Sequence, residues 1–439
     1  MKRIACILAA MAALSGCGLF GGNDSPQTPT VGNRTPILVS EDEIEVDAQI
    51  ASVPVVLPAA SVNPDWLQPG GNASKAMGHL ALGASPARAW SVSIGAAGSN
   101  RARLAAPPVV GNGRVYTIDT NATVRAFDAR NGGEVWSTRF GTEIGGEAAL
   151  FGGGVSISGE RVYVTNGVGY VGALDAATGA VVWKVRPGPP LRGSPTIANN
   201  QLYVLSQDNQ LYALNMADGS TEWNVAGAVQ TSGVFGVAAP ASAQGTVVAG
   251  YSSGELIAYR YENGRVLWQD VLDRTNISTS VSTLSDIDAS PVITDGTVYA
   301  VGQGGRMVAL GLSTGQRLWE IGAGGLSTPW IAGDWMFVVT DTARLVAIAR
   351  ATGRIRWITQ LPRFRDEEDR EGPIFWRGPV LAGGNLILTS SRGHLSFVDA
   401  TTGTIRRTDT LDKPFELSPV VADNTLYLLD ADGRLSAWR

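Results

Sequence analysis

Cysteine and histidine are nearly absent from this chain of 439 residues. Two of each occur: Cys6 and Cys17 near the start, and His79 and His394 far apart. Neither histidine has a second ligand at the spacing that metal sites use, and no two cysteines are adjacent. We therefore expect no metal site, and we find no nucleophile motif beside either histidine, so no catalytic residue is assigned.

Basic residues do not outnumber acidic ones, and charged residues are few. The chain has 34 Lys and Arg against 39 Asp and Glu, for a formal net charge of −5, and 17% of it is charged. A nucleic-acid-binding protein would show a clustered basic stripe, which this sequence lacks. The 44% hydrophobic content is enough to bury a large core, which excludes a disordered chain.

An apolar run at the start of the chain is too short to cross a membrane. It extends over Ile4–Ala13 behind two basic residues, whereas a bilayer core of ~30 Å needs about 20 residues. It ends in "LSGC", which resembles the lipobox of bacterial lipoproteins. We expect residues 1–16 to be a signal peptide. The resemblance implies cleavage before Cys17 and lipid attachment to it, which leaves no internal disulfide.

Residues 17–81 differ in composition from the rest of the chain. Prolines recur, glycines cluster, and neither a helical nor a strand period persists. These features are typical of a flexible tether, so we expect residues 17–81 to link the lipidated Cys17 to a folded domain of residues 82–439. In lipoprotein families an Asp after the lipidated Cys can signal inner-membrane retention. Gly18 stands here, consistent with a lipid anchor in the outer membrane, facing the periplasm.

The folded part is a repeat whose landmark residues keep a constant spacing. A first landmark, mostly Pro, is followed after 8, 10 and 10 residues by an aromatic or apolar residue, usually an Ala, and usually a Trp. The complete units are Pro108-Tyr116-Ala126-Trp136, Val155-Tyr163-Ala173-Trp183, Pro195-Tyr203-Ala213-Trp223, Pro240-Val248-Ala258-Trp268, Pro291-Tyr299-Ala309-Trp319, Pro329-Phe337-Ala347-Trp357 and Pro379-Ile387-Phe397-Arg407. An eighth unit begins as Pro419-Tyr427-Ala437, and the chain then ends.

These units predict an all-β fold, an eight-bladed β-propeller with four strands in each blade. β-branched and aromatic residues alternate with Gly, Asn and Asp turns at short intervals, as propeller blades require. The eighth unit lacks its Trp strand, and the sequence around Trp90 has the matching pattern. We expect the Trp90 strand to complete the last blade and close the ring, which removes an exposed sheet edge.

The turn before each Trp also has a structural explanation. In "DAATGAVVW", Asp175 can accept backbone hydrogen bonds and Gly179 can adopt a positive φ. Trp183 follows four residues later and is expected to fill the wedge between neighbouring blades. The motif therefore predicts a turn and packing, without chemistry of its own.

The Trp-motif propeller resembles two families. One comprises the pyrroloquinoline quinone (PQQ) dehydrogenases, and the other is the BamB family, lipoproteins of the outer-membrane β-barrel assembly (Bam) machine. The first family implies a cation, a quinone, a carboxylate base and often an adjacent cysteine pair. This chain has no such pair and lacks the long insertions of those enzymes. We therefore expect no cofactor and no enzyme activity, with a PQQ-dependent dehydrogenase as the alternative.

Two stretches favour the BamB resemblance. "PPLRGSP" contains Leu191 and Arg192, and "LSDIDASP" contains Asp286 and Asp288. Both look like the loops with which that family binds the periplasmic domains of BamA, the barrel-forming subunit. The resemblance thus implies a non-catalytic Bam subunit that binds BamA through these four residues and assists the insertion of β-barrel proteins. The prolines before Leu191 depart from the family pattern.

The spacing supports these residues independently. All length variation falls between the Trp landmark of one unit and the first landmark of the next. Insertions confined to one connection emerge on one face, and such a face often binds partners. Arg192 and Asp288 each stand three residues before a Pro, so we expect them on one rim, two blades apart. Asp286 can instead cap a turn, and Arg192 can pair with a neighbouring carboxylate.

Two further features of these connections stay open. The charged run at 363–372 is interpreted as a solvated loop tip. Trp376 stands three residues before Pro379 on the same rim. It is either an aromatic anchor for a partner or a packing residue between blades.

Overall fold

The computed structural model describes residues 44–98, 102–142, 152–228, 238–272, 286–303, 305–411 and 413–439. These residues form strands and turns, with no helix among them. Accordingly, no segment of the described chain is a helix long and apolar enough to cross a bilayer. Cys17 and the predicted signal peptide lie outside the described residues.

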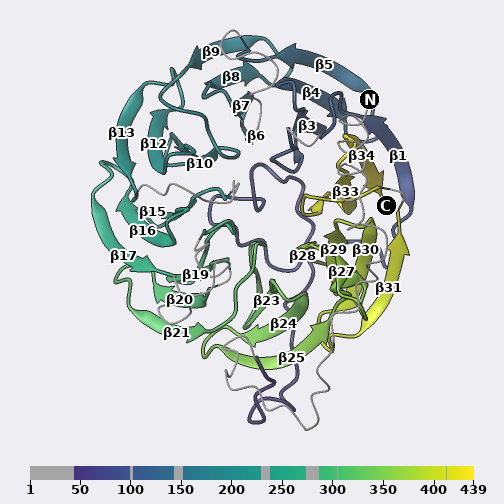
Figure 1. The fold of residues 1–439 in the computed structure, drawn as a ribbon. Helices are drawn as coiled ribbons and strands as arrows, with labels where there is room; N and C mark the ends of the chain where they lie inside the picture. Colours follow the sequence, from purple (N-terminus) through teal and green to yellow (C-terminus); the bar gives the residue numbers. More distant parts are fainter. Residues whose placement is uncertain are drawn as a thin grey trace, which may run out of the picture. The chain divides into compact units, whose positions relative to one another are not determined.

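Eight four-stranded antiparallel sheets follow one another around a ring (Figure 1). Blades 1 to 3 contain β2(Val109–Gly111), β3(Arg114–Ile118), β4(Thr123–Asp128), β5(Glu134–Arg139); β6(Gly153–Ser158), β7(Arg161–Asn166), β8(Val171–Asp175), β9(Val181–Val185); β10(Thr196–Ala198), β11(Gln201–Leu205), β12(Gln210–Asn215) and β13(Thr221–Ala226). Blades 4 to 6 contain β14(Ala241–Ala243), β15(Thr246–Gly250), β16(Glu255–Arg260), β17(Val266–Val271); β18(Val292–Thr294), β19(Thr297–Val301), β20(Met307–Gly311), β21(Arg317–Ile321); β22(Trp330–Ala332), β23(Trp335–Val339), β24(Arg344–Ala349) and β25(Arg354–Gln360).

The last two blades show how the ring closes. Blade 7 contains β28(Trp376–Ala382), β29(Asn385–Ser390), β30(His394–Asp399) and β31(Ile405–Thr410), and blade 8 contains β32(Val420–Ala422), β33(Thr425–Leu429) and β34(Arg434–Trp438). The fourth strand of blade 8 is β1(Arg88–Ser93), which pairs with β34 so that Trp90 faces Ala437. The predicted eight-bladed fold and its closure by the Trp90 strand are therefore confirmed.

The constant spacing of the landmarks has a direct structural cause. In blade 3, Tyr203 lies opposite Ala213 and Ala213 lies opposite Trp223. The same cross-strand pairing occurs in every blade, including Ile387, Phe397 and Arg407 in blade 7. Because each landmark must stand beside the next one across the sheet, an insertion within a blade would shift the register and turn side chains to the wrong face.

The landmark Trp of a blade packs against the glycine turn of the following blade. Trp136 donates its indole N–H to the carbonyl of Ala176, 3.0 Å away, and its ring covers Gly179. Gly179 has a φ of +74°, and a Cβ added there would lie 2.5 Å from the Trp136 ring. Glycine is thus required for both its backbone conformation and its lack of a side chain. Trp90 covers Gly132 in the same way, where the last blade meets the first. These Trp–glycine contacts between neighbouring blades are here called the seam.

Arg407 replaces Trp at the one junction where the following blade has no such turn. In blade 8 the third strand β34 ends beside the C-terminus, and the fourth strand is the separate segment β1. A Trp at position 407 would therefore have no glycine turn to cover. Arg407 instead lies over the ring of Phe397, 4.4 Å from its centroid, and pairs with Asp409 at 3.0 Å.

The predicted tether needs a correction, because its second half is part of the folded domain. Residues 61–80, here called the central strap, wind through the middle of the ring (Figure 1). Trp66, Lys75 and Leu80 are buried there. Residues 44–58 continue along blade 6, where Asp47 donates its backbone N–H to the Ile355 carbonyl at 2.9 Å. The folded unit therefore starts well before residue 82.

The central strap forms hydrogen bonds with all eight blades, at or next to the first strand of each. Trp66 exchanges two backbone hydrogen bonds of 2.8 Å with Val110 in blade 1, and Leu80 donates to the Leu381 carbonyl in blade 7 at 3.1 Å. The remaining contacts use Ile157, Ile197, Ser242, Ile293, Trp330 and Asp423 in blades 2, 3, 4, 5, 6 and 8. The innermost strand of a blade has a free backbone edge, and the strap supplies partners for that edge in most blades, whereas in blade 6 it accepts the indole N–H of Trp330.

Candidate functional site

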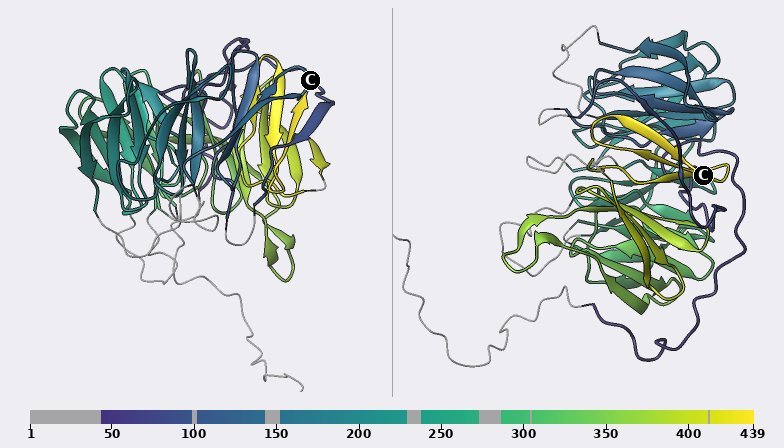
Figure 2. Two further views of the ribbon diagram at one scale, coloured as in Figure 1. Left: turned by 90° about the horizontal axis from the view of Figure 1, so that it is seen from above. Right: turned by 90° about the vertical axis from the view of Figure 1, so that its right-hand side faces the viewer.

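The two faces of the ring differ in what they carry. Because the strands alternate in direction, the connections between blades emerge on one face, here called the connection face, and the glycine turns lie on the other. Figure 2 shows the hairpin of β26(Phe364–Asp366) and β27(Glu371–Pro373) projecting from the connection face, with the strap on the opposite side. The four predicted partner-binding residues all belong to the connection face.

Leu191 is a core residue. Its side chain is fully buried and belongs to a cluster with Leu202 and Tyr212. A bridge to Ser206 fixes its backbone against the second strand of blade 3. Leu191 therefore holds the connection before blade 3 in place and presents no side-chain surface to a partner.

Arg192 and Asp286 form an ion pair with each other. The Arg192 Nη2 lies 3.4 Å from the Asp286 Oδ1, and the two side chains are 4% and 1% exposed. The pair joins the connections before blades 3 and 5, which the sequence predicted to be separate points on the rim. The alternative interpretation, that Arg192 pairs with a carboxylate, is therefore confirmed. Arg192 does not present an exposed charge to a partner.

The ion pair leaves several polar atoms without partners. Arg192 Nε and Nη1, Asp286 Oδ2 and Asp288 Oδ1 are buried and make no hydrogen bond with the part of the chain that the structure describes. Burial raises the pKa of Asp286, and the facing Arg192 guanidinium opposes that rise. For Asp288, burial and the nearby Asp286 carboxylate raise the pKa to about 7. Unsatisfied buried charge of this kind is costly and is more common at functional sites than elsewhere.

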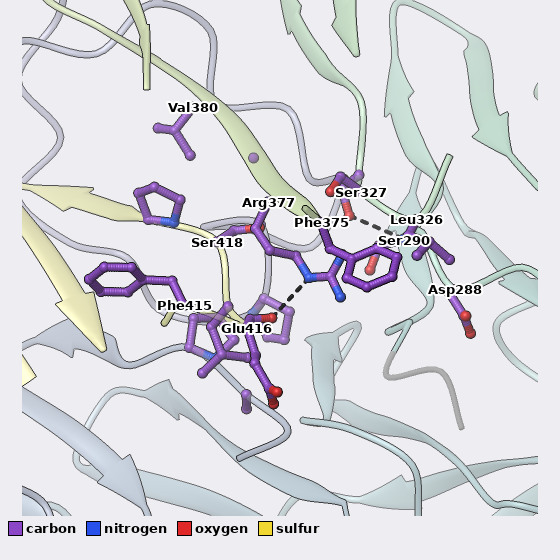
Figure 3. Close-up of a pocket in the computed structure, with 18 of the residues that line it drawn as sticks. Asp288, Ser290, Leu326, Ser327, Phe375, Arg377, Val380, Phe415, Glu416 and Ser418 are labelled. Carbon is purple, nitrogen blue, oxygen red and sulfur yellow. Dashed lines mark hydrogen bonds between the residues drawn. The ribbon is translucent and has the colours of Figure 1, made fainter. Parts of the chain in front are cut away.

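A cavity of about 580 Å³ occupies the centre of the ring. The strap closes its inner end with Trp66, which stacks on Trp330 at a centroid distance of 6.1 Å. The other end opens on the connection face, between residues that precede the first strands, such as Ser194 and Asp288. Asp288 thus links the predicted rim to the cavity, which Figure 3 shows from close by.

The structure locates the charged run at 363–372 and Trp376, the two features that the sequence left open. The run at 363–372 is the exposed β26–β27 hairpin, in which Phe364 pairs with Pro373. Trp376 is 5% exposed, stacks on His394 in the same blade and donates its indole N–H to the Pro362 carbonyl at 2.9 Å. Trp376 therefore packs within blade 7 and below the hairpin, and it is not exposed as an anchor for a partner.

The sequence interpretation missed Lys75 and Arg377, two cations of the cavity wall. Lys75 lay inside the predicted tether, and Arg377 lies next to Trp376 without any motif of its own. A possible signal for Lys75 was the cluster of Gly70 and Gly71 beside it, since both adopt positive φ. Among the described residues, no three His, Cys, Asp or Glu side chains come together as a metal site.

Comparison with known proteins identifies the family. The family described as "Outer membrane protein assembly factor BamB" matches residues 120–359 and 364–438. The protein of that name from Escherichia coli K12 is 30% identical over 392 residues, covering 79% of this chain and 87% of its own. The Yersinia pestis protein of the same name is 28% identical over 359 residues, covering 81% of this chain and 89% of its own.

Solved structures show the same fold in both families that the sequence resembles. BamB from Moraxella catarrhalis has a TM-score of 0.69 at 19% identity, covering 81% of this chain and all of that one. The quinohemoprotein alcohol dehydrogenase of Comamonas testosteroni has a TM-score of 0.65 at 14% identity, covering 86% of this chain and 81% of that one. Fold similarity therefore does not separate an assembly factor from an enzyme, whereas the sequence matches do. The chain belongs to the BamB family of outer membrane protein assembly factors.

Proposed function

We propose that this protein is a non-catalytic subunit of the Bam complex that binds BamA and assists the insertion of β-barrel proteins into the outer membrane. The observation that carries this proposal is the 30% identity over 392 residues to a protein named as an outer membrane protein assembly factor. The propeller fold supports a scaffold, because a closed ring presents long connections on one rigid face.

BamA binds on the connection face in this proposal. Leu191, Arg192 and Asp286 act there by holding two connections in position, since all three are buried. Asp288 is half-buried at the mouth of the cavity and is the member of the four best placed to meet a partner directly. The β26–β27 hairpin adds charged, exposed surface on the same face.

The protein is anchored in this proposal by lipid on Cys17 and faces the periplasm. Residues 17–43 then form the part of the tether that precedes the folded unit, which is much shorter than the 17–81 segment expected from composition. Several acyl chains hold a protein firmly to a membrane, whereas a single chain does not. Changing Cys17→Ala should release the protein into the soluble periplasmic fraction, and a variant that stays firmly in the membrane would refute the anchor.

Affinity purification from detergent-solubilised membranes tests the partner. The full chain should recover BamA, and Asp288→Asn should reduce the recovery, because the substitution removes a charge at the mouth with little change in volume. Glu262→Gln is the matched control, since it makes the same carboxylate-to-amide change at an exposed residue of the fourth blade, which pairs with Arg260 at 3.1 Å. Recovery of a folded chain without any BamA would contradict the proposal.

The enzyme alternative is tested separately with the purified chain, PQQ and calcium. We expect no alcohol or sugar oxidation, because the sequence lacks the adjacent cysteine pair and the long insertions of those dehydrogenases. Turnover that depends on both PQQ and calcium would overturn the assignment to a non-catalytic role.

A further inference from the structure

We propose that the central cavity binds a carboxylate carried on an apolar group, with Lys75 and Arg377 as its cationic ligands. This proposal does not depend on the BamA-binding role proposed above, although Asp288 at the mouth of the cavity is common to both. The proposal rests on the size of the cavity, the chemistry of its walls and the placement of its charges.

The cavity has the size and lining of a small-molecule site. Its volume of about 580 Å³ lies within the range of about 300–1,000 Å³ that ligand pockets occupy. Its walls include Trp66, Trp330, Phe375, Phe415 and Val380. Phe375 is 53% exposed at its edge, so part of its ring is accessible to a ligand. A ligand with an apolar body would cover these surfaces.

Prolines restrict how a ligand can be held. The mouth is lined by Pro107, Pro373, Pro379 and Pro419, two of which are first landmarks of the repeat. Proline has no backbone N–H, so these positions cannot donate hydrogen bonds to an added strand. Hydrogen-bond donors for a ligand at this end must therefore come from other groups of the cavity wall, among them its basic side chains.

The charges of the wall favour an anion. Four basic residues line the cavity against two acidic ones, although the whole chain has a net charge of −5. The basic residues are Lys75, Arg103, Arg377 and Arg392, and the acidic ones are Asp288 and Glu416. A positively charged concavity in an acidic protein concentrates anions at that site.

Lys75 is a buried cation without an acidic partner among the described residues. Its side chain is 2% exposed, and its Nζ makes one hydrogen bond, of 3.1 Å, to the Thr196 Oγ1. Burial without a counter-ion lowers the pKa of Lys75 to about 7. An ammonium can donate three hydrogen bonds, so a carboxylate in the cavity would supply both the missing charge and a missing acceptor.

Arg377 lines the same cavity from the opposite side of the ring. It lies in blade 7, whereas Thr196, the partner of Lys75, lies in blade 3. Its Nε donates to the Glu416 carbonyl oxygen at 3.0 Å, which fixes one edge of the guanidinium (Figure 3). Among the described residues, its other hydrogen bond runs from Nη1 to the Trp376 carbonyl at 3.5 Å, which leaves Nη2 for an anion. Charge-assisted bonds of this kind are about twice as strong as neutral ones.

A matched pair of ligands tests the proposal on the unchanged protein. N-acetyl-leucine and N-acetyl-leucinamide differ only in whether the terminal group is a carboxylate or an amide. Calorimetric titration of the full chain should show that the acid binds about tenfold or more tightly than the amide, because only the acid pairs with the two cations. Equal binding of the two ligands, or no binding of the acid, would overturn the proposal.

Two variants locate the site. Arg377→Met and Lys75→Met should each reduce the affinity for the acid to near that of the amide, while Arg260→Gln on the outer surface should leave it unchanged. If Arg377→Met fails to fold, Lys75→Met still tests the same cavity from its opposite wall. Folded variants that keep the full preference for the acid would place the anion elsewhere and refute the assignment.

The source of the carboxylate is distinguished with a pentapeptide, Gly-Ser-Gly-Ser-Leu, with a free or an amidated C-terminus. Binding of the free-acid peptide at least as tightly as N-acetyl-leucine indicates that the cavity takes the end of a polypeptide. Binding of the small acid alone indicates a free organic acid. BamA recovery is measured on the same variants, and its loss or retention does not affect this result.

Discussion

The periphery and the axis of the ring differ in whether their contacts repeat from blade to blade. At the periphery, a Trp covers a glycine turn of the next blade at seven junctions, from Trp90 on Gly132 to Trp357 on Gly403. At the axis, the strap, the Arg192–Asp286 pair and the cavity cations each occur once. The repeated contacts at the periphery therefore stabilise the ring. The contacts that occur once lie at its axis, where the candidate functional residues are. The difference suggests variants whose effects should separate the two regions.

The largest effect is expected at the periphery. Trp268 is 7% exposed and donates its indole N–H to the Leu312 carbonyl at 2.7 Å. Trp268→Ala should lower stability by about 3–5 kcal/mol, because it leaves a cavity between two blades. Leu267→Ala, at a 44% exposed neighbour, should change stability by less than about 0.5 kcal/mol. Similar losses for both, measured by urea denaturation, would mean that the seam is not the main source of stability.

The buried ion pair at the axis should give the next largest effect. Arg192→Met leaves the Asp286 carboxylate buried without its cation, which should cost about 3 kcal/mol. Adding Asp286→Leu should recover most of that loss, since an apolar pair can replace a buried ion pair. A double variant as unstable as the sum of its singles would show that the two residues act independently.

Replacement of Lys75 should stabilise the protein in a pH-dependent manner. The pKa of Lys75 falls from 10.5 to about 7 on folding, so burying its charge opposes folding fully below pH 7. The penalty disappears as the pH rises towards 10.5, where the unfolded chain also loses the proton. After allowance for the lost Thr196 hydrogen bond, Lys75→Met should gain about 2 kcal/mol at pH 6. Denaturation midpoints at pH 6 and pH 10 should show that gain shrinking, and a constant gain would exclude this cause.

The smallest effect is expected at the junction of blades 7 and 8, where Arg407 stands in place of the landmark Trp. Arg407→Trp restores the landmark residue of the repeat but should change stability by less than about 1 kcal/mol. Blade 8 has no glycine turn to receive the ring, and Arg407 already covers Phe397. Thermal denaturation beside the Trp268→Ala variant provides the scale. A large stabilisation would mean that Trp contributes through its own blade and not through the next one.

The candidate site was only partly predictable. The spacing of Arg192 and Asp288 before their prolines placed both on the connection face, and the structure agrees. The pairing of Arg192 with Asp286 depends on how far each connection leans towards the axis, which no spacing records. The strap was interpreted as a tether because its contacts are mainly backbone hydrogen bonds around a ring, which impose no side-chain period. Residues such as Trp66 and Leu80 were therefore not recognised as core.

The sequence by itself determined the number of blades, the register within each blade and the strand that closes the ring. These follow from local rules: cross-strand neighbours lie at a constant separation along the chain, and a tight turn needs its glycine. The tertiary structure alone decided what fills the centre of that ring. There, Lys75 and Arg377 are some 300 positions apart in the chain, and only closure of all eight blades brings their charges to the same cavity.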